Sequence, residues 1–462
     1  MKSMKLKTTL ILLLCSIVFT YSGLAQDSTQ LKGFTKPLSL EECIQYGLEN
    51  NQNLKSVRLQ EQIAETQVGE TRSLGLPQVG FQAGVNYNYE VQKAFLPAAF
   101  TGDTTAGPDE SVPLPFGVEY DGNAAFSASQ LLFDGSYFVG LQAAKTLREL
   151  RQKETNRSEV ATVEAITSAF YLVLINQERL ELIESNINQL KEILADTKAL
   201  YENGFAENIA VDRLQVNLNN SLTEQNNTRR NLNYSKNLLK FQMGLKISQP
   251  IELQGSLKDL ELNAGEYMKE ENSFNYEQRP DIQILQVNKR LTELDLKNNK
   301  ATHLPKLYAN WNYGWNTGTN NTSELFDFQD RWLSFGSVGV SIQWNLFTGL
   351  RRSSLMERNR IQLDQLNLQE ELLQNSIDLE ISQNKADLLS ATENLEIQKE
   401  NMKLANKVYK QAQLKYKEGV GSSLELLEAE TSKKTAETNY YAALYSAVIA
   451  KVSLEKALGI LY

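Results

Sequence analysis

The sequence predicts an α+β fold in which long α-helical coiled-coil hairpins are joined to four amphipathic β-strands. Three observations support this prediction. Two runs, 141–203 and 350–418, contain neither glycine nor proline. Four shorter segments alternate apolar and polar residues with the two-residue period of a strand. The whole plan, a strand pair followed by a helical hairpin, occurs twice along the chain.

The first 25 residues have the pattern of a secretory signal peptide. An apolar run, "TTLILLLCSIVFTYSG", follows three basic residues, Lys2, Lys5 and Lys7. The small residues Gly23 and Ala25 stand where a signal peptidase reads, so we expect cleavage after Ala25. Leu14 is not the small residue that lipoprotein processing requires before a cysteine, so we do not expect Cys15 to be lipidated.

Composition restricts the classes of function. The chain carries 47 Lys and Arg against 56 Asp and Glu, a formal net charge of −9. Removal of the three signal lysines takes the charge to about −12, which argues against nucleic acid as a partner. Cys43 is then the sole cysteine, which excludes an internal disulfide framework. His303 is the only histidine, so we expect no metal site, no cofactor and no enzymatic activity.

The apolar segments after the signal peptide are short. A membrane helix requires roughly 20 consecutive apolar residues. The best candidates are "AFYLVLI" at 169–175 and "YYAALYSAVIA" at 440–450. We therefore expect that, if the protein spans a membrane, it does so with β-strands.

The two glycine- and proline-free runs predict helices of about 95 to 100 Å at 1.5 Å per residue. Apolar residues recur with a period of 3.5, which indicates coiled-coil packing. One such seam is Ile183, Ile187, Leu190, Leu194 and Tyr201; the other is Leu424, Leu427, Thr431, Thr438, Tyr441, Tyr445, Val448 and Val452. The remaining surface is polar, as in 214–233, so we expect a wall one helix thick with water on both faces.

Two strand pairs are expected, within about 76–133 and about 304–347. In the first pair, 76–89 alternates regularly and 123–133, "NAAFSASQLLF", does so less regularly. In the second pair, 304–315 and 339–347 both alternate, so each strand has one apolar and one polar face. The connections 93–115 and 316–330 are rich in Gly, Pro, Asp and Thr, and they predict exposed loops.

All four tryptophans lie in or beside the second strand pair: Trp311, Trp315, Trp332 and Trp344. An outer-membrane barrel places an aromatic girdle at such positions. The alternation alone leaves open an ordinary sandwich core that uses tryptophan as filler. Four strands are too few to close a membrane barrel, and an open sheet edge cannot face lipid. A barrel would therefore require more than one copy of the chain.

The internal repeat divides the mature chain. Leu-Pro pairs at 76–77 and 304–305 open the two strand pairs, and "LLFDG" and "NLFTG" close them. A glycine turn follows each pair, at Gly204 and Gly419, with nearly constant offset. We expect the first repeat over 26–244 and the second over 278–462. The linker 245–277 differs in sequence pattern from both repeats, and it is expected to form a small girdle of short structural elements outside the helices.

These features resemble the TolC-like outer-membrane efflux family. The resemblance rests on "LSLEECIQYGLENNQNLKSV", with a capping box at Ser39 and Glu42, on "NYEQRPDIQ", on the strand-pair motifs and on the two glycine turns. It covers essentially the whole mature chain. It implies four strands per protomer, a transmembrane β-barrel completed by trimerisation, and a periplasmic tunnel of long helical hairpins.

The resemblance also implies a function. Members of the family are outer-membrane exit ducts of tripartite efflux or type I secretion systems in Gram-negative bacteria. The duct is passive, and an inner-membrane pump drives drugs, metabolites or polypeptides into it through a periplasmic adaptor. The alternative is a secreted structural coiled-coil interaction protein, which would need no alternating strands with tryptophan.

Site residues follow from the same resemblance. The family's glycine turns are hairpin tips where the tunnel narrows and the adaptor docks, which here implies Tyr201, Gly204, Phe205, Tyr416, Gly419, Val420 and Gly421. Acidic residues after the second turn ring the constriction in the family, and Glu425 and Glu428 match them. Arg213, at the equivalent turn of the first repeat, is their candidate partner. Without the family, these two glutamates would be assigned to a solvated helix face.

Overall fold

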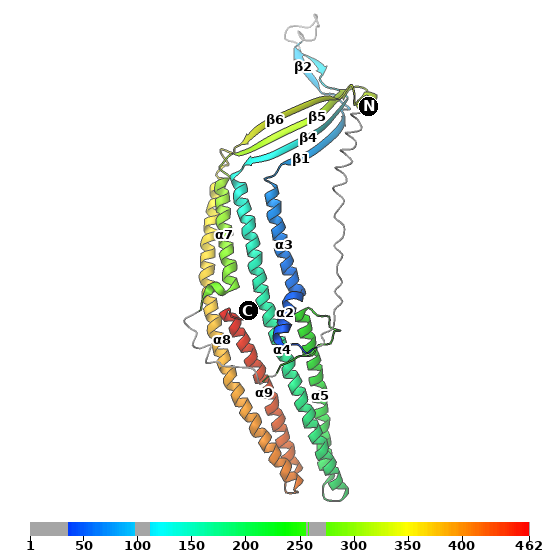
Figure 1. The fold of residues 1–462 in the computed structure, drawn as a ribbon, viewed down its shortest axis with the longest axis vertical. Helices are drawn as coiled ribbons and strands as arrows, with labels where there is room; N and C mark the ends of the chain where they lie inside the picture. Colours follow the sequence, from blue (N-terminus) through cyan, green and yellow to red (C-terminus); the bar gives the residue numbers. More distant parts are fainter. Residues whose placement is uncertain (1–35, 98–110, 256, 258–273, 462) are drawn as a thin grey trace.

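The computed structural model describes residues 36–97, 111–255, 257 and 274–461. The predicted signal peptide and most of the expected linker lie outside these residues. The molecule is elongated, with a β-sheet at one end and the turns of two helical hairpins at the other (Figure 1). Two long helices, α4 (Gly135–Glu202) and α8 (Arg351–Lys417), run between these ends. The expected long helices are thus confirmed.

Shorter helices complete each half of the body. α3 (Gln52–Ser73) and α5 (Asn208–Met243) both pack along α4, whereas α7 (Pro280–Ala301) and α9 (Ser423–Leu458) both pack along α8. A first short helix, α2 (Leu40–Asn50), begins with the predicted capping box. Ser39 Oγ accepts from the Glu42 N–H, and Glu42 Oε2 accepts from the Ser39 N–H. Along each long helix, one short helix therefore packs near the sheet and another packs near the turn (Figure 1).

Polar side chains form hydrogen bonds at the two junctions where one short helix ends and another begins. Asn51, at the start of α3, donates from Nδ2 to the Gln242 carbonyl near the end of α5 at 2.7 Å. Arg279, before α7, donates to the Ala457 carbonyl of α9 at 2.7 Å and pairs with Glu380 at 2.9 Å. The last carbonyls of a helix lack partners within the helix, and a cation there also favours the negative end of the helix dipole. These contacts hold the stacked helices in register.

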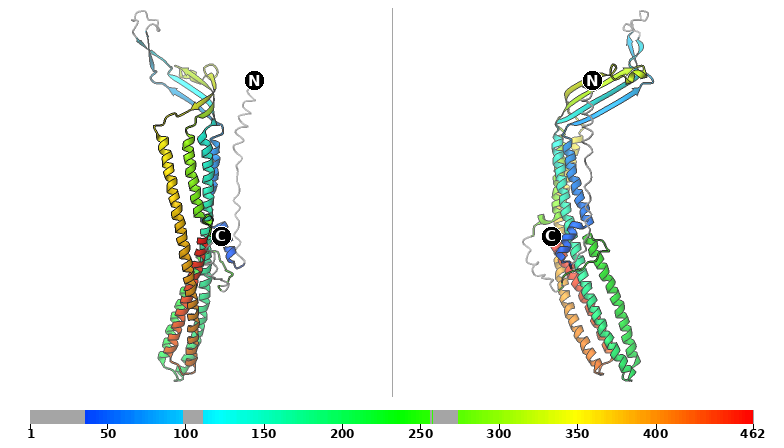
Figure 2. Two further views of the ribbon diagram at one scale, coloured as in Figure 1. Left: turned by 90° about the vertical axis from the view of Figure 1, so that its left-hand side faces the viewer. Right: turned by 45° about the vertical axis from the view of Figure 1, so that its right-hand side comes forward.

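The sheet has the strand order β1-β4-β5-β6 and is antiparallel throughout. Its strands are β1 (Gln78–Tyr87), β4 (Tyr120–Phe133), β5 (Lys306–Thr319) and β6 (Leu333–Gln343). The register aligns apolar residues across it, as in the row Val79, Ala128, Trp311 and Val338. A neighbouring row on the other face is Gln78, Ser129, Asn310 and Gly339. Each repeat contributes two strands, and apolar side chains predominate on one face. Figure 2 shows the sheet inclined to the helices.

Two details of the strand prediction were wrong. The last strand was expected at 339–347 but lies at Leu333–Gln343, because Gln343 pairs with Lys306, the first residue of β5. The segment 93–115, expected as a loop, contains a hairpin of β2 (Lys93–Pro97) and β3 (Ser111–Pro115). Its prolines suggested a loop, but both strands of a two-stranded ribbon are edges, where proline is tolerated. β5 also extends into the expected loop 316–330, which holds a 3₁₀ turn, η4 (Thr322–Phe326).

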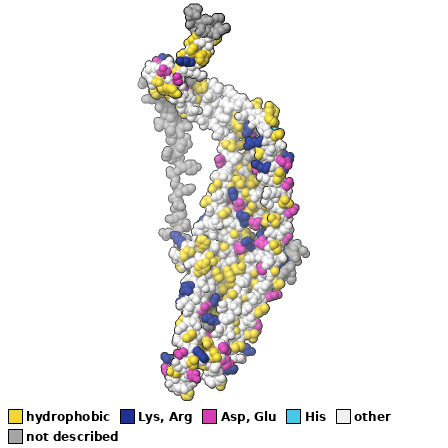
Figure 3. All heavy atoms as spheres, turned by 180° about the vertical axis from the view of Figure 1, so that it is seen from behind, with side chains coloured by type: hydrophobic (Ala, Val, Ile, Leu, Met, Phe, Trp, Pro, Cys, Tyr) yellow, Lys and Arg dark blue, Asp and Glu magenta, His cyan; other side chains and the backbone are white. Residues whose placement is uncertain are grey.

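The two larger of the apolar clusters among the described residues hold the helices together. The central cluster lies where α2, α4, α5 and α9 meet and includes Cys43, Phe170, Leu239 and Leu444. The tip cluster lies closer to the turns and includes Leu190, Leu214, Tyr409 and Leu426. Elsewhere the helical body exposes apolar side chains between charged ones of both signs (Figure 3). The expected thin wall therefore describes much of the body, with thicker packing at these two levels.

The expectation that all apolar segments after the signal peptide are too short for a membrane helix was wrong. Among the described residues, α4 contains an 18-residue window with a mean hydropathy of 1.5, enough to cross a membrane by length and composition alone. Half of that window is buried inside the protein. Ile166, Phe170 and Val173 of this helix belong to the central cluster. Core packing between helices accounts for an apolar stretch of this kind.

Candidate functional site at the hairpin tips

The turn between α4 and α5 is closed by a left-handed glycine. Gly204 has φ +79°, and the Phe205 N–H donates to the Leu200 carbonyl at 2.8 Å. This is the backbone pattern with which many helices end, and it requires a residue that tolerates positive φ. No atom lies within 4 Å of a Cβ added at Gly204. Backbone conformation, and not crowding, is thus what requires glycine.

The turn between α8 and α9 repeats this arrangement and adds a second glycine. Gly419 has φ +73°, and the Val420 N–H donates to the Lys415 carbonyl at 3.0 Å. Gly421 is required for a different reason. A Cβ at this position would lie 2.9 Å from the backbone nitrogen of Tyr416, closer than real contacts allow.

The two turns lie at the same end of the molecule (Figure 1). Phe205 is 82% exposed and Val420 is 78% exposed, so each tip presents an apolar side chain to its surroundings. The Tyr416 hydroxyl of α8 lies 3.0 Å from the Thr197 hydroxyl of α4. Tyr201 is also exposed, one residue before the end of α4. The seven predicted tip residues therefore lie at the same end of the molecule, divided between the two hairpins.

The predicted constriction residues lie beside these turns, but their partners differ from the prediction. Glu425 receives a hydrogen bond from Lys415 at 2.9 Å, across its own turn. Arg213 contacts the Ser423 hydroxyl at 3.5 Å and pairs with neither glutamate. Glu428 is exposed and has no ion pair among the described residues. Lys415 was missed because it stands ten positions before Glu425, on the opposite side of the turn.

The tryptophans occupy three levels of the sheet. Trp311 and Trp315 stand on the apolar face of β5. Trp332 folds back near Gly122, where an added Cβ would lie 3.0 Å from its ring. Trp344 lies at the end closer to the helices, just beyond β6, and donates to the His303 carbonyl at 2.9 Å. The membrane girdle stays a prediction, and the positions of the four tryptophans are compatible with it.

A buried charged group on α9 escaped the sequence analysis. The predicted seam contained Leu424, Thr431 and Thr438, but these three side chains are exposed. The buried face instead includes Leu426, Ala429, Lys433, Ala436 and Glu437. A search for apolar spacing passes over charged residues, although the 3-4 spacing of Glu430, Lys433 and Glu437 places them on one helix face. Among the described residues no group of His, Cys, Asp or Glu could hold a metal ion.

The chain thus combines duplicated helical hairpins with an open sheet of four strands at one end and apolar turns at the opposite end. The family model for "Outer membrane efflux protein" matches residues 43–244 and 275–460. These segments make up most of the chain, so the chain belongs to the outer membrane efflux protein family.

Individual relatives agree with the family. The outer membrane protein TolC of Vibrio cholerae is 24% identical over 330 residues, covering 69% of this chain and 67% of that protein. The probable efflux pump outer membrane protein TtgC of Pseudomonas putida is 23% identical over 415 residues, covering 86% of this chain and 82% of its own. The crystal structure of VceC from Vibrio cholerae superposes with a TM-score of 0.66 at 15% identity, covering 91% of this chain and 96% of VceC.

Family membership fixes the general role. The protein is an outer-membrane efflux channel of the Gram-negative envelope that extends into the periplasm. The family consists of channel proteins, and it functions in tripartite pumps with an adaptor and an inner-membrane pump. The alternative of a secreted structural coiled-coil protein is not favoured.

Proposed function

We propose that three copies of the chain close one barrel of twelve strands, four from each copy, and continue it as a helical tunnel. The observation that carries this proposal is the sheet itself. Among the described residues its order leaves β1 and β6 with one unpaired edge each, and rows of apolar residues run across all four strands. Lipid offers no hydrogen-bonding partners, so a spanning sheet must close on itself. Pairing β6 of one copy with β1 of the next achieves this closure.

The helices support the same assembly. β6 is exposed along its whole length, and α8, which follows it, exposes several large apolar side chains: Ile361, Leu368, Leu372, Leu379 and Leu389. These residues follow 7-4-7-10 spacings, all compatible with a heptad seam. A neighbouring copy would cover both the strand edge and this seam. The polar faces of the wall would then line a lumen filled with water.

The duct discharges cargo without an energy source of its own. Drugs, metabolites or polypeptides enter from an inner-membrane pump, and a periplasmic adaptor docks on the exposed tips around Phe205 and Val420. Outer-membrane lipid surrounds the apolar face of the sheet, with the tryptophans at its boundaries. No nucleic acid and no cofactor take part.

At the tips, Glu425 and Glu428 ring the narrowest part of the tunnel. Three copies bring six carboxylates together, and at separations of about 6 to 8 Å each pair repels by roughly 0.5 to 0.7 kcal/mol in water. The Lys415 contact neutralises part of this charge at Glu425. Cations in the lumen offset the remainder, which makes the entrance cation-selective.

Two measurements test the assembly and the duct. We expect a heat-labile trimer when the mass of the purified protein is measured in detergent, and discrete conductance steps when it is added to a planar bilayer. A stable monomer would overturn the barrel, whereas a trimer without conductance would overturn only the open duct. Extraction from membranes by salt alone would favour a structural coiled-coil protein instead.

A further inference from the structure

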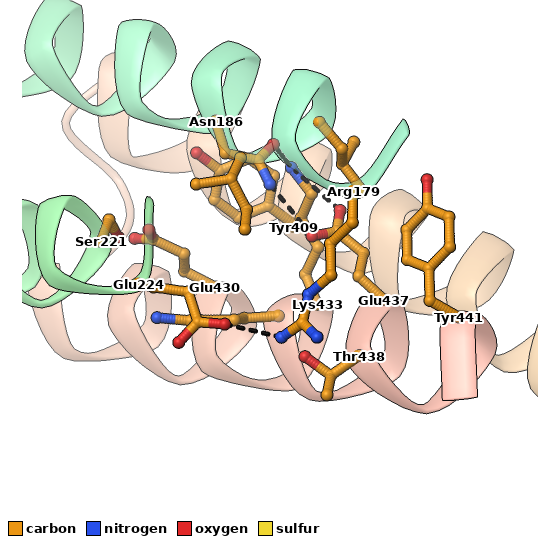
Figure 4. A pocket seen from close by; sticks show the side chains of 13 residues that line it. Arg179, Asn186, Ser221, Glu224, Tyr409, Glu430, Lys433, Glu437, Thr438 and Tyr441 are labelled. Carbon is orange, nitrogen blue, oxygen red and sulfur yellow. Dashed lines mark hydrogen bonds and ion pairs between the residues drawn. The ribbon is translucent and has the colours of Figure 1, made fainter. Parts of the chain in front are cut away.

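A layer of buried polar and charged side chains crosses the interface between the two hairpins (Figure 4). Lys433 Nζ of α9 donates to Asn186 Oδ1 of α4 at 2.7 Å, and Asn186 Nδ2 donates to Glu437 Oε2 at 3.0 Å. Glu430, one turn closer to the tip, accepts a short hydrogen bond from Asn217 of α5. One face of α9 therefore holds polar side chains of both helices of the first hairpin.

The charges in this layer are incompletely compensated. The side chains of Lys433 and Glu437 are 8% and 7% exposed, yet the nitrogen and oxygen of their ion pair are 3.7 Å apart. Within the described residues, Glu437 Oε1 has no hydrogen-bond donor. The Lys433 ammonium lies 4.6 Å from the centroid of the Tyr409 ring of α8. Burying charges costs free energy unless their geometry is excellent, and apolar replacements are often neutral or stabilising.

The layer separates the two apolar clusters. On one side the tip cluster joins Leu190, Leu214 and Leu426, and on the other the central cluster joins Phe170 and Leu444. Apolar contact between the hairpins is therefore interrupted at the level of Lys433. An interface is weakest where its charges are buried without full compensation, so the hairpins are held firmly above and below this layer but not within it.

The surrounding charges do not resolve the imbalance. Arg179 of α4 lies close by, but it is already paired with Glu224 of α5 at 2.6 Å. The other titratable groups that face the layer are Lys434 and Tyr441 on α9 and Tyr409 and Lys410 on α8. Burial raises the pKa of the carboxyls of Glu430 and Glu437, and it lowers the pKa of the Lys433 ammonium.

We propose that Glu430, Lys433 and Glu437 form a proton-responsive joint, which weakens the contact between the hairpins at neutral pH and tightens it when the glutamates bind protons. The joint lies within one copy of the chain and does not depend on the barrel or on conduction. Its ligand is the proton, and its effect is on how readily the second hairpin separates from the first.

The direction of the pH effect follows from linkage. A carboxyl with a higher pKa in the packed hairpins binds its proton more tightly there than after separation, when its pKa returns toward 4.5. Packing therefore gains stability as the pH falls through the raised pKa of Glu430 and Glu437. Lys433 has a lowered pKa in the packed state, so its charge opposes packing equally at every pH below that pKa.

Hydrogen exchange of the full-length protein in detergent tests the joint. Amides at 208–222 and 423–436 should exchange more slowly at pH 5.5 than at pH 8, after correction for the intrinsic rate. In the double variant Glu430→Gln, Glu437→Gln, this difference should disappear. In the triple variant Asn186→Leu, Lys433→Met, Glu437→Leu, exchange should slow about tenfold at both pH values.

The control is an exposed ion pair of the same type on α8. Glu400 and Lys403 are 3.3 Å apart and exposed, so Glu400→Gln, Lys403→Met should retain the wild-type pH response. Amides at 166–175, in the central cluster, report whether each variant is folded. A pH response that persists in the glutamine variant would overturn the proposal. So would faster or unchanged exchange in a folded apolar variant.

Discussion

The two hairpins have nearly the same dimensions but different surroundings. α4 and α8 have 68 and 67 residues, and their partners α5 and α9 both have 36. Fifteen residues of α4 are buried, against seven of α8. The reason is position: α4 packs against α3, α5, α7 and α9, whereas α8 contacts only α7 and α9 extensively among the described helices. The duplication thus repeats the dimensions of the hairpin, while the order of the helices along the chain decides which of the two long helices is covered by other helices.

The largest effect is expected where the uncovered hairpin would meet another copy. Leu372→Glu, Leu379→Glu places two charges in the exposed apolar seam of α8 and should abolish the trimer, because buried unpaired charge is costly. Asn367→Glu, at an exposed polar position on the same helix but on a different face from the seam, should leave it intact. Mass measurement in detergent decides between them. A trimer in the leucine variant would place the interface elsewhere.

A smaller effect is expected at the joints between stacked helices. Arg279→Met removes a charged cap from two carbonyls and two carboxylates, and it should lower the free energy of unfolding by about 2 to 3 kcal/mol. Asn51→Leu removes a neutral cap and should cost about 1 kcal/mol. Thermal unfolding of both variants checks this order. Equal losses would show that the charge at Arg279 adds nothing to the second joint.

The sequence predicted much of the fold, because its periodicities change sharply between strands and helices. Long runs without glycine or proline leave few alternatives to a helix. The β6 boundary was missed because alternation continues through Trp344 and Leu346, beyond the last ladder pair at Gln343. Tyr441, Val448 and Val452 of the predicted α9 seam are buried as expected. The part of the buried face closer to the turn was missed because Lys433 and Glu437 are polar by composition and become core residues only through contacts with the other hairpin.

The candidate site was less predictable than the fold. Gly204 and Gly419 were found because a break in a helical pattern is a local signal. The pairing of Glu425 with Lys415 depends on the path of the chain around the turn, which spacing does not specify. The separation of Arg213 from both glutamates depends on how two hairpins dock, and no local pattern encodes this arrangement.

The glycine turns should respond alike to a β-branched side chain. Gly204→Val and Gly419→Val should each cost about 1 to 3 kcal/mol locally, since both φ values are positive. Either change should impair adaptor crosslinking and export while leaving the trimer intact. Gly69→Val, in α3 with open space around it, serves as the control. Unchanged crosslinking in both tip variants would show that the adaptor docks elsewhere.

The smallest effect concerns ions at the tips. Glu425→Ala, Glu428→Ala should weaken cation selectivity and block by multivalent cations in single-channel recordings. Lys415→Ala should strengthen both, because it releases Glu425 from its ion pair. Arg213→Ala should change basal conductance little, since Arg213 contacts only the Ser423 hydroxyl among the site residues. Unaltered selectivity in the glutamate variant would return both acids to a solvated surface.

The unpaired edges of the sheet also determine how the protein must be made. A single copy carries two exposed edge strands, and either edge can pair with a strand of another chain and start aggregation. It cannot rest in lipid as a stable intermediate, since its edge amides would stay unsatisfied there. Secretion and oligomer formation are therefore coupled steps. If three copies close the barrel as proposed, each newly made copy has to be kept from wrong strand pairing in the periplasm until it meets two others.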